Sequence, residues 1–240
     1  MSRTGYVHEI FASIQGEGIY CGQKHVFVRL AGCNLQCAYC DTAWSRKPDP
    51  PLCRICPSDI PGSQLSNPVN VASLVDVCSK TGARVVAITG GEPLCQPGFL
   101  RELALGIRSV GLLVYLETNG TLPDEFDSVR ELVDIVAMDF KLPSSARLGE
   151  YWDQHRAFLQ MAATSEVFAK AVVNCETSVD EIATCAQVIL SVRRPIPLVI
   201  QPVFGEGPDG AVLAKMQDAA LDIIDDVRVI PQIHKMLGVQ

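Results

Sequence analysis

The sequence predicts an α/β fold in which parallel strands alternate with helices along most of the chain. Short apolar runs rich in β-branched residues recur, and most are followed by a segment with helical periodicity. The 240 residues, 48% of them hydrophobic, are enough to bury a large core. Strands that alternate with helices pair in parallel, because each crossover helix returns the chain to the same end of the sheet.

The predicted elements follow one another in a regular order. The strands are the apolar runs 25–30, 84–88, 112–116, 134–138, 167–173, 198–200 and 227–230. The helical patterns are 71–79, 99–110, 125–132, 150–163, 179–192 and 211–222. Ser178, with Glu181 three residues later, predicts a capping box at the start of the helix 179–192. About six such units favour a partial barrel, since a complete eight-unit barrel typically needs about 250 residues.

Two stretches interrupt this alternation. Residues 6–23 precede the first barrel strand, and we expect them to form a hairpin or ribbon. Residues 42–68 are rich in Pro and Ser, have no clear period and carry Cys53 and Cys56. We interpret about 43–68 as a loop inserted after the first barrel strand. The predicted organisation is a single domain over 1–240 with this insertion.

Composition excludes several classes of partner. The net charge of −7 argues against a nucleic-acid partner bound through its phosphates, which needs a clustered basic surface. No window approaches the roughly 18 consecutive apolar residues of a membrane helix, and the N-terminus has no stretch resembling a signal peptide. We therefore expect a cytoplasmic protein without a membrane partner. In such a protein, ten cysteines indicate metal or redox chemistry rather than disulfides.

Three of these cysteines, Cys33, Cys37 and Cys40, directly follow the first predicted strand. Three thiolates on one loop can face one centre, and a 4Fe–4S cluster held by three thiolates keeps one iron open. The amino and carboxylate groups of S-adenosylmethionine (SAM) can chelate that iron. The alternative is a non-enzymatic zinc-binding module, with Cys53 and Cys56 as further ligands.

The cysteine pattern resembles that of the radical SAM superfamily, whose hallmark is CxxxCxxC after the first strand of a barrel. The segment 89–93, TGGEP, follows the second predicted strand, where the family's glycine backbone binds the SAM amino group. Glycine permits such a close approach because it has no Cβ. Tyr39 matches the aromatic residue that packs on the adenine in many relatives, with a local core position as the alternative. The resemblance implies a partial (β/α)6 barrel of the radical SAM type.

A nearer resemblance, to the 7-carboxy-7-deazaguanine synthase family, covers nearly the whole chain. It rests on the segments 10–18 (IFASIQGEG), 26–35 (VFVRLAGCNL), 40–42 (CDT), 117–120 (ETNG), 201–202 (QP) and 232–235 (QIHK). The chain departs from the family at 139–141, which reads DFK where several members have SPK. It also has Gln240 where some members end in a proline whose carboxylate meets the substrate.

The resemblance implies a role for each residue that matches a motif. It implies the 4Fe–4S cluster on Cys33, Cys37 and Cys40, and Mg²⁺ on Thr42. It implies SAM contacts from Tyr39, Cys40, Asp41, Gly91, Glu92, Asp139, Phe140, Lys141 and Gln201. It implies substrate contacts from Ile14, Gln15, Gly16, Glu17, Arg29, Thr89, His234 and Gln240.

Several of these assignments have structural alternatives. Arg29 lies in an apolar strand that leads into the cysteine loop, where an unpaired cation is costly to bury. A substrate carboxylate would relieve that cost, but a buried carboxylate of the protein could pair with the guanidinium instead. Thr42 could simply end a turn, the run 15–18 could be a turn between strands, and His234 could be structural.

The implied reaction converts 6-carboxy-5,6,7,8-tetrahydropterin to 7-carboxy-7-deazaguanine with loss of ammonia, in queuosine or another deazapurine pathway. The resemblance further implies a carbon–nitrogen lyase that acts as a homodimer with a flavodoxin- or ferredoxin-like electron donor. A rival within the superfamily is an activase that installs a glycyl radical on a partner protein. Activases often carry cysteine-rich insertions, but a full ferredoxin-type cluster needs about four cysteines and this insertion has two.

Overall fold

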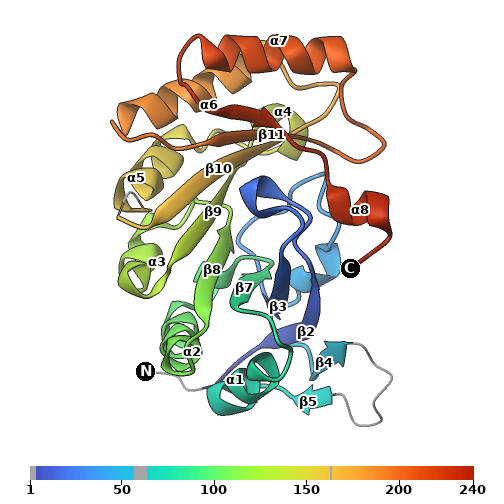
Figure 1. The fold of residues 1–240 in the computed structure, drawn as a ribbon, viewed down its shortest axis with the longest axis vertical. Helices are drawn as coiled ribbons and strands as arrows, with labels where there is room; N and C mark the ends of the chain where they lie inside the picture. The colour runs from blue at the N-terminus through green and yellow to red at the C-terminus, as the bar shows by residue number, and fades with distance from the viewer. Residues whose placement is uncertain (1–3, 57–63, 163) are drawn as a thin grey trace.

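The computed structural model describes residues 4–56, 64–162 and 164–240, which are built around a ten-stranded sheet (Figure 1). The strand order is β12-β11-β10-β9-β8-β7-β3-β2-β4-β5. The seven predicted strands are confirmed, with small shifts at their ends, and all pair in parallel: β3 (Lys24–Leu30), β7 (Val85–Gly90), β8 (Leu113–Thr118), β9 (Ile135–Phe140), β10 (Glu166–Val173), β11 (Leu198–Pro202) and β12 (Val227–Val229). The parallel α/β architecture expected from the sequence is therefore present.

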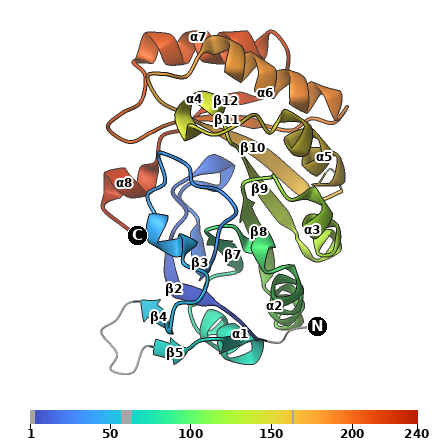
Figure 2. The ribbon, with the colours of Figure 1, turned by 180° about the vertical axis from the view of Figure 1, so that it is seen from behind.

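Helices cover the outer side of the curved sheet, as Figures 1 and 2 show. They are α1 (Val71–Ser79), α2 (Pro97–Ser109), α3 (Pro123–Asp127), α5 (Trp152–Ala162), α6 (Val179–Ser191) and α7 (Gly210–Leu221). The capping box of α6 is confirmed, since Ser178 Oγ accepts from Glu181 N (3.2 Å) and Glu181 Oε2 accepts from Ser178 N (3.1 Å). No helix in the described ranges is long and apolar enough to cross a membrane.

The helix predicted over 125–132 is shorter than expected. It divides into α3 and a 3₁₀ turn, η4 (Arg130–Leu132). Pro123 occupies the first turn of α3, where its missing N–H costs nothing. The Ser128 hydroxyl bonds back to the Glu125 carbonyl (2.7 Å) at the end of α3, a local bond that competes with continuation of the helix. Residue 163, the last of the predicted helix 150–163, lies outside the described residues.

The N-terminal hairpin is formed by other residues than predicted. β2 (Val7–Ile14) pairs antiparallel with β3 itself, and η1 (Gly18–Tyr20) lies in the connection between them. The hairpin thus includes the first barrel strand instead of lying within 6–23. The Phe11 and Phe27 rings stack across the two strands, with centroids 4.8 Å apart, and help to fix this pairing.

The insertion contains regular structure where a loop was expected. It holds η2 (Ala43–Arg46), β4 (Leu52–Cys56) and β5 (Gln64–Ser66), while its residues 57–63 lie outside the described ranges. β4 pairs in parallel with β2 and antiparallel with β5, so the insertion extends the sheet at one edge. A separate short pair, β1 (Thr4–Gly5) with β6 (Val69–Asn70), joins the N-terminal segment to the end of the insertion.

The two faces of the sheet bury different kinds of side chain. The outer face packs against the helices in the main apolar core, whereas the inner face carries a smaller apolar cluster that includes Phe27, Ala87, Tyr115, Ala137, Phe168 and Val199. Two residues after each of these, on the same side of the same strand, comes a polar residue: Arg29, Thr89, Glu117, Asp139, Lys170 and Gln201. The inner face therefore has an apolar floor, with a polar layer above it at the carboxyl ends of the strands.

The floor should be a major source of stability. Phe168 is 1% exposed and packs beside Tyr20 and Tyr115, with ring centroids 6.2 and 6.3 Å away. We expect Phe168→Ala to lower the free energy of unfolding by about 3–5 kcal/mol, because it leaves a cavity in the floor. Urea unfolding of the cluster-free protein measures this. Phe204→Ala, at a 55% exposed phenylalanine, is the matched control and should change stability by no more than about 0.5 kcal/mol. Equal effects of the two variants would contradict a packed floor.

Candidate active site

The predicted site residues converge on one cavity of about 510 Å³ at the carboxyl ends of the strands. All of them except Phe140 line it, although they are spread from Ile14 to Gln240 along the chain. The cysteine loop forms one wall, the loop between β2 and β3 another, and the C-terminal segment a third. The active sites of barrel enzymes are built at this end of the strands.

The three cysteines after β3 are free thiols that face this cavity. Burial raises the pKa of Cys33 and Cys37, and the Lys141 ammonium partly offsets this effect at both. Within the described ranges, no group of three or more His, Cys, Asp or Glu side chains is close enough to hold a metal ion. One loop that presents three cysteines to one cavity fits the ligand set of a 4Fe–4S cluster with an open iron.

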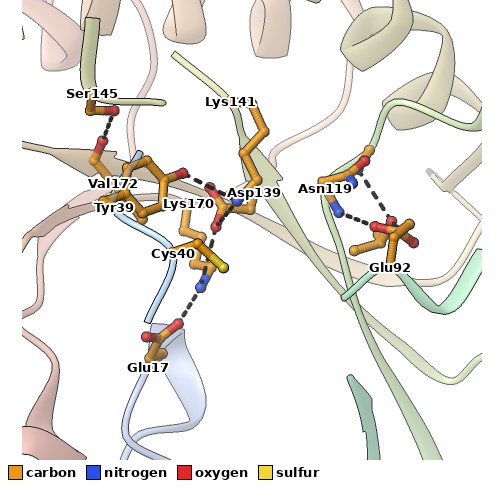
Figure 3. A network of polar contacts seen from close by, with 12 residues as sticks. Glu17, Tyr39, Cys40, Glu92, Asn119, Asp139, Lys141, Ser145, Lys170 and Val172 are labelled. Atoms are coloured by element: carbon orange, nitrogen blue, oxygen red, sulfur yellow. Dashed lines mark hydrogen bonds and ion pairs between the residues drawn. The ribbon is translucent and has the colours of Figure 1, made fainter. Parts of the chain in front are cut away.

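The cysteine loop rests on α4 (Pro143–Ala146), a short helix that the sequence patterns did not predict. Ala38 N donates to Ala146 O (2.9 Å), between the second and third cysteines. Ser145 is buried, and its hydroxyl donates to Val172 O on β10 (2.6 Å; Figure 3). These two bonds tie the cysteine loop to α4 and to the barrel strand β10.

The surroundings of the cysteines combine a close backbone contact with two buried polar side chains that have unpaired atoms. A Cβ on Gly91 would lie 2.1 Å from Gly32 O and 2.8 Å from Cys33 Cβ, so glycine alone allows this strand end to approach the cysteine loop. On the opposite side, Gln201 is 1% exposed, and neither Oε1 nor Nε2 has a partner among the described residues. Asp139 Oδ1 is also buried and has no hydrogen-bond partner among the described residues. Buried polar atoms without partners cost about 1–3 kcal/mol each, which a ligand with donors and acceptors would recover.

The carboxylate of Glu92, predicted to contact SAM, is already engaged within the protein. It accepts from Asn119 N (2.7 Å), Thr118 Oγ1 (2.9 Å) and Leu94 N (3.0 Å). Complete burial raises its pKa to about 6, against the effect of these hydrogen bonds. The side chain thus ties the turn after β7 to the end of β8, and the Gly91 and Glu92 N–H groups of this turn are bonded to Leu30 O (3.3 Å) and Gly32 O (2.8 Å).

A buried network of charges crosses the cavity (Figure 3). The Lys170 ammonium pairs with Glu17 and lies 3.5 Å from Asp139 Oδ2. The Lys141 ammonium lies 3.0 Å from the same Asp139 oxygen and donates to the Tyr39 hydroxyl (3.1 Å). Burial alone would lower the pKa of both lysines, but Glu17 at Lys170 and Asp139 at Lys141 outweigh it and raise both. The network links the loop between β2 and β3 to the cysteine loop.

The C-terminal segment closes the cavity beside the loop between β2 and β3. α8 (Ile233–Leu237), which was not predicted, begins where Ile233 N donates to Gly16 O (2.9 Å). A Cβ on Gly16 would lie 2.3 Å from His234 Nδ1, so this contact requires glycine. Lys235 forms an ion pair with Asp41 (2.8 Å), which joins α8 to the cysteine loop. The motif residues at the two ends of the chain are therefore in direct contact.

Arg29 pairs with a buried carboxylate of the protein, which is one of the two alternatives that the sequence left open. Its Nε donates to Glu9 Oε1 (2.8 Å), and Glu9 is only 2% exposed. The guanidinium is therefore not an unpaired buried cation. Among the described residues, Nε is the one atom of this group that makes a hydrogen bond, and the side chain lines the cavity. Its two Nη atoms keep their donors for a carboxylate.

The surroundings of Phe140 and of the insertion cysteines follow from the alternation of strand neighbours between the two faces of the sheet. The fully buried Phe140 ring lies in the outer core beside His155, with centroids 5.0 Å apart, so its side chain cannot contact SAM in the cavity. Cys53 belongs to the same outer core, whereas Cys56 packs on the inner cluster. Three residues apart on β4, they point to opposite faces and form no chelating pair.

Sequence reasoning missed several cavity residues, among them Glu9, Trp44, Glu117, Lys170 and Gln232. A signal was present for four of these. Glu117 and Gln232 lie in the motif segments 117–120 and 232–235. Glu9 and Lys170 are charges in the interior of mainly apolar strands, and charged side chains are rarely buried without a partner or a function.

Comparison with known proteins agrees with this geometry. The profile of the radical SAM superfamily matches residues 27–171. The 7-carboxy-7-deazaguanine synthase of Geobacter sulfurreducens is 39% identical over 253 aligned residues, which cover 99% of this chain and 99% of that protein. The chain belongs to the 7-carboxy-7-deazaguanine synthase family. A second family member, from Methanopyrus kandleri, is 37% identical, and the alignment covers 96% of this chain and 92% of that protein.

The crystal structure of QueE from Escherichia coli superimposes with a TM-score of 0.66 over 97% of this chain and 96% of that chain. At 20% identity, it shows the same fold.

Membership in the 7-carboxy-7-deazaguanine synthase family makes the protein a radical SAM lyase and implies a 4Fe–4S cluster and SAM as cofactors. It replaces both alternatives, the activase and the zinc-binding module. The hint of an accessory metal site in the insertion also disappears, because Cys53 and Cys56 face opposite sides of the sheet.

The Glu17 carboxylate should make stability depend on pH in acid. Burial favours a higher pKa, but the Lys170 ammonium and the Gln232 and Lys170 hydrogen bonds bring the pKa down to about 2. The ionised group therefore stabilises the fold fully above about pH 4.5, and this contribution is lost as the pH falls toward 2. Between pH 6 and pH 3, we expect cluster-free Glu17→Gln to lose less stability than wild type, by on the order of 1–2 kcal/mol. Urea unfolding across this range tests this, and parallel pH profiles would refute it.

Proposed function

We propose that the protein converts 6-carboxy-5,6,7,8-tetrahydropterin to 7-carboxy-7-deazaguanine with loss of ammonia, in queuosine or another deazapurine pathway. One observation carries the proposal: a single cavity is lined both by the three-cysteine loop and by Arg29, whose Nη donors are unused among the described residues. The 39% identity over the full length of a named synthase supports the same substrate.

In this proposal, the cluster is held by Cys33, Cys37 and Cys40, and SAM binds between the Gly91 turn and Gln201. When bound, the cluster and SAM would supply a 5′-deoxyadenosyl radical for hydrogen abstraction from the substrate. The protein contributes position and charge. The Gly91 backbone, which the absence of a Cβ brings against the cysteine loop, would meet the SAM amino group there, and the unpaired Gln201 amide offers both a donor and an acceptor. Tyr39, held by Lys141, offers an aromatic face beside the cysteines.

The substrate would be oriented from the other side of the cavity. The Arg29 guanidinium bonds the carboxylate, which directs the carbon that bears it toward the cysteine loop. Gln15, Glu17, Thr89 and His234 supply acceptors and donors for the pterin edge. The α8 segment against the Gly16 loop excludes water from this side, so that reactive species are not quenched.

Further properties rest on the sequence alone, either on its composition and pattern or on the motif resemblance, and are part of the proposal. They are Mg²⁺ held by Thr42, a flavodoxin- or ferredoxin-like electron donor, a homodimer, a cytoplasmic location and one radical SAM domain over 1–240. For Mg²⁺, the Thr42 hydroxyl lines the cavity 4.0 Å from Cys40 Sγ, beside the proposed cluster. A single hydroxyl would need substrate oxygens and waters to complete an octahedron.

Anaerobic reconstitution tests the function and its cluster ligands together. Reconstituted wild type should convert the carboxytetrahydropterin to the deazaguanine in the presence of SAM and reductant. Cys→Ala at position 33, 37 or 40 should abolish the cluster absorption and SAM cleavage, since each change removes one thiolate ligand. Cys53→Ser is the control and should keep both, because Cys53 lies in the outer core. Full activity in any variant of the three loop cysteines would refute the assignment.

Magnesium should raise turnover, and Thr42→Ala should weaken this response. SAM binding should change little, since SAM is assigned to other residues. Titration of Mg²⁺ into wild type and Thr42→Ala, with turnover and SAM affinity measured separately, gives both readouts. Thr42→Ser keeps the hydroxyl and should respond as wild type does. Identical metal dependence in wild type and Thr42→Ala would remove Thr42 from the metal site.

A further inference from the structure

The insertion contributes a charged residue, Arg54, that lies next to the cavity-lining residues Glu9 and Arg29. Arg54 lies on β4 directly opposite Glu9 on β2, and Glu9 lies opposite Arg29 on β3. Residues paired across adjacent strands project on the same face of the sheet. The three charges therefore form one row across three strands that are far apart in the sequence.

Glu9 divides its carboxylate between the two arginines. Its Oε1 accepts from Arg29 Nε (2.8 Å), and its Oε2 accepts from Arg54 Nη2 (3.2 Å). The Glu9 and Arg29 side chains are 2% and 13% exposed, whereas that of Arg54 is 57% exposed. Two guanidinium groups and one carboxylate leave the row with one net positive charge.

Trp44, also from the insertion, contacts both cations. Its ring centroid lies 5.7 Å from Arg29 Cζ and 5.3 Å from Arg54 Cζ, within the range of cation–π attraction. The ring packs edge-on against His8, with centroids 5.1 Å apart. The insertion thus holds the row in place by a salt bridge and by an aromatic side chain.

We infer that the insertion is a positioning element for substrate recognition, in which Arg54, acting through Glu9, keeps the Nη donors and the charge of Arg29 available for the substrate carboxylate. This rests on the proposed function. Without Arg54, the buried Glu9 Oε2 loses its partner, and Arg29, already bonded to Oε1, offers the adjacent donors. Arg29 and Glu9 would then form a neutral bidentate pair that competes with the substrate.

Steady-state kinetics of Arg54→Gln with 6-carboxy-5,6,7,8-tetrahydropterin tests this. KM should rise about three- to tenfold, in keeping with the modest worth of a partly exposed ion pair, while kcat stays within about twofold. Binding of 5,6,7,8-tetrahydropterin, which lacks the carboxylate, should not change. Arg54→Lys should restore most of the affinity. Arg156→Gln, which breaks an exposed pair with Asp153 on α5, is the matched control and should leave KM unchanged.

A double-mutant cycle separates this role from a general structural one. In a Glu9→Gln background, no carboxylate competes for Arg29, so adding Arg54→Gln should have little further effect on KM. Cluster content and urea unfolding should show that each variant is folded. Two outcomes would overturn the inference and leave the proposed function standing. One is an unchanged KM in Arg54→Gln, and the other is a loss of affinity in this variant that is as large for 5,6,7,8-tetrahydropterin as for the carboxylated substrate. A reconstituted wild type that does not turn over the carboxytetrahydropterin would overturn the proposed function and this inference with it.

Discussion

The buried ammonium of Lys170 is the interaction on which the shape of the cavity depends. It lies between Asp139, on the neighbouring strand β9, and Glu17, in the loop that connects β2 and β3. Removing one partner of such a buried pair typically costs about 3–5 kcal/mol, because the remaining charge is left uncompensated. The loop is therefore held over the strand ends, and Gly16 in this loop receives α8. The connection of the barrel to the loop between β2 and β3, and through Gly16 to α8, therefore depends on this one charge.

The floor below this network explains why much of the site could be predicted from the sequence. A strand residue and the next but one share a face, so an apolar residue followed by a polar one, as in Phe168 and Lys170, marks the boundary between floor and site. Strand positions and the cysteine loop are local patterns, and they were predicted with small errors at their ends. The same rule places the Phe140 side chain on the outer face, because its neighbours Asp139 and Lys141 face the cavity, so the predicted SAM contact of Phe140 could be made only by its backbone.

What could not be predicted depends on contacts between distant segments. Nothing local to Arg29 identifies Glu9 as its partner, because the register of β2 on β3 is set by pairing across the loop between them. The strands of the insertion carry no clear period, and β4 is defined by its place on the edge of β2 rather than by its own pattern. The helices α4 and α8 are too short for a periodic signal, and each is fixed by the loop that it supports.

The two sides of the cavity also differ in net charge. On one side, Glu17, Asp139, Lys141 and Lys170 combine two carboxylates with two ammonium groups, and the cavity-lining carboxylate of Glu117, which acts on Lys170, adds a negative charge. On the other side, the row of Arg29, Glu9 and Arg54 has an excess of one positive charge. Under the proposed function, a substrate with one carboxylate therefore gains most by placing it at Arg29 and its neutral ring edge against the network. The positive charge that the insertion contributes at Arg54 strengthens the preference for this orientation.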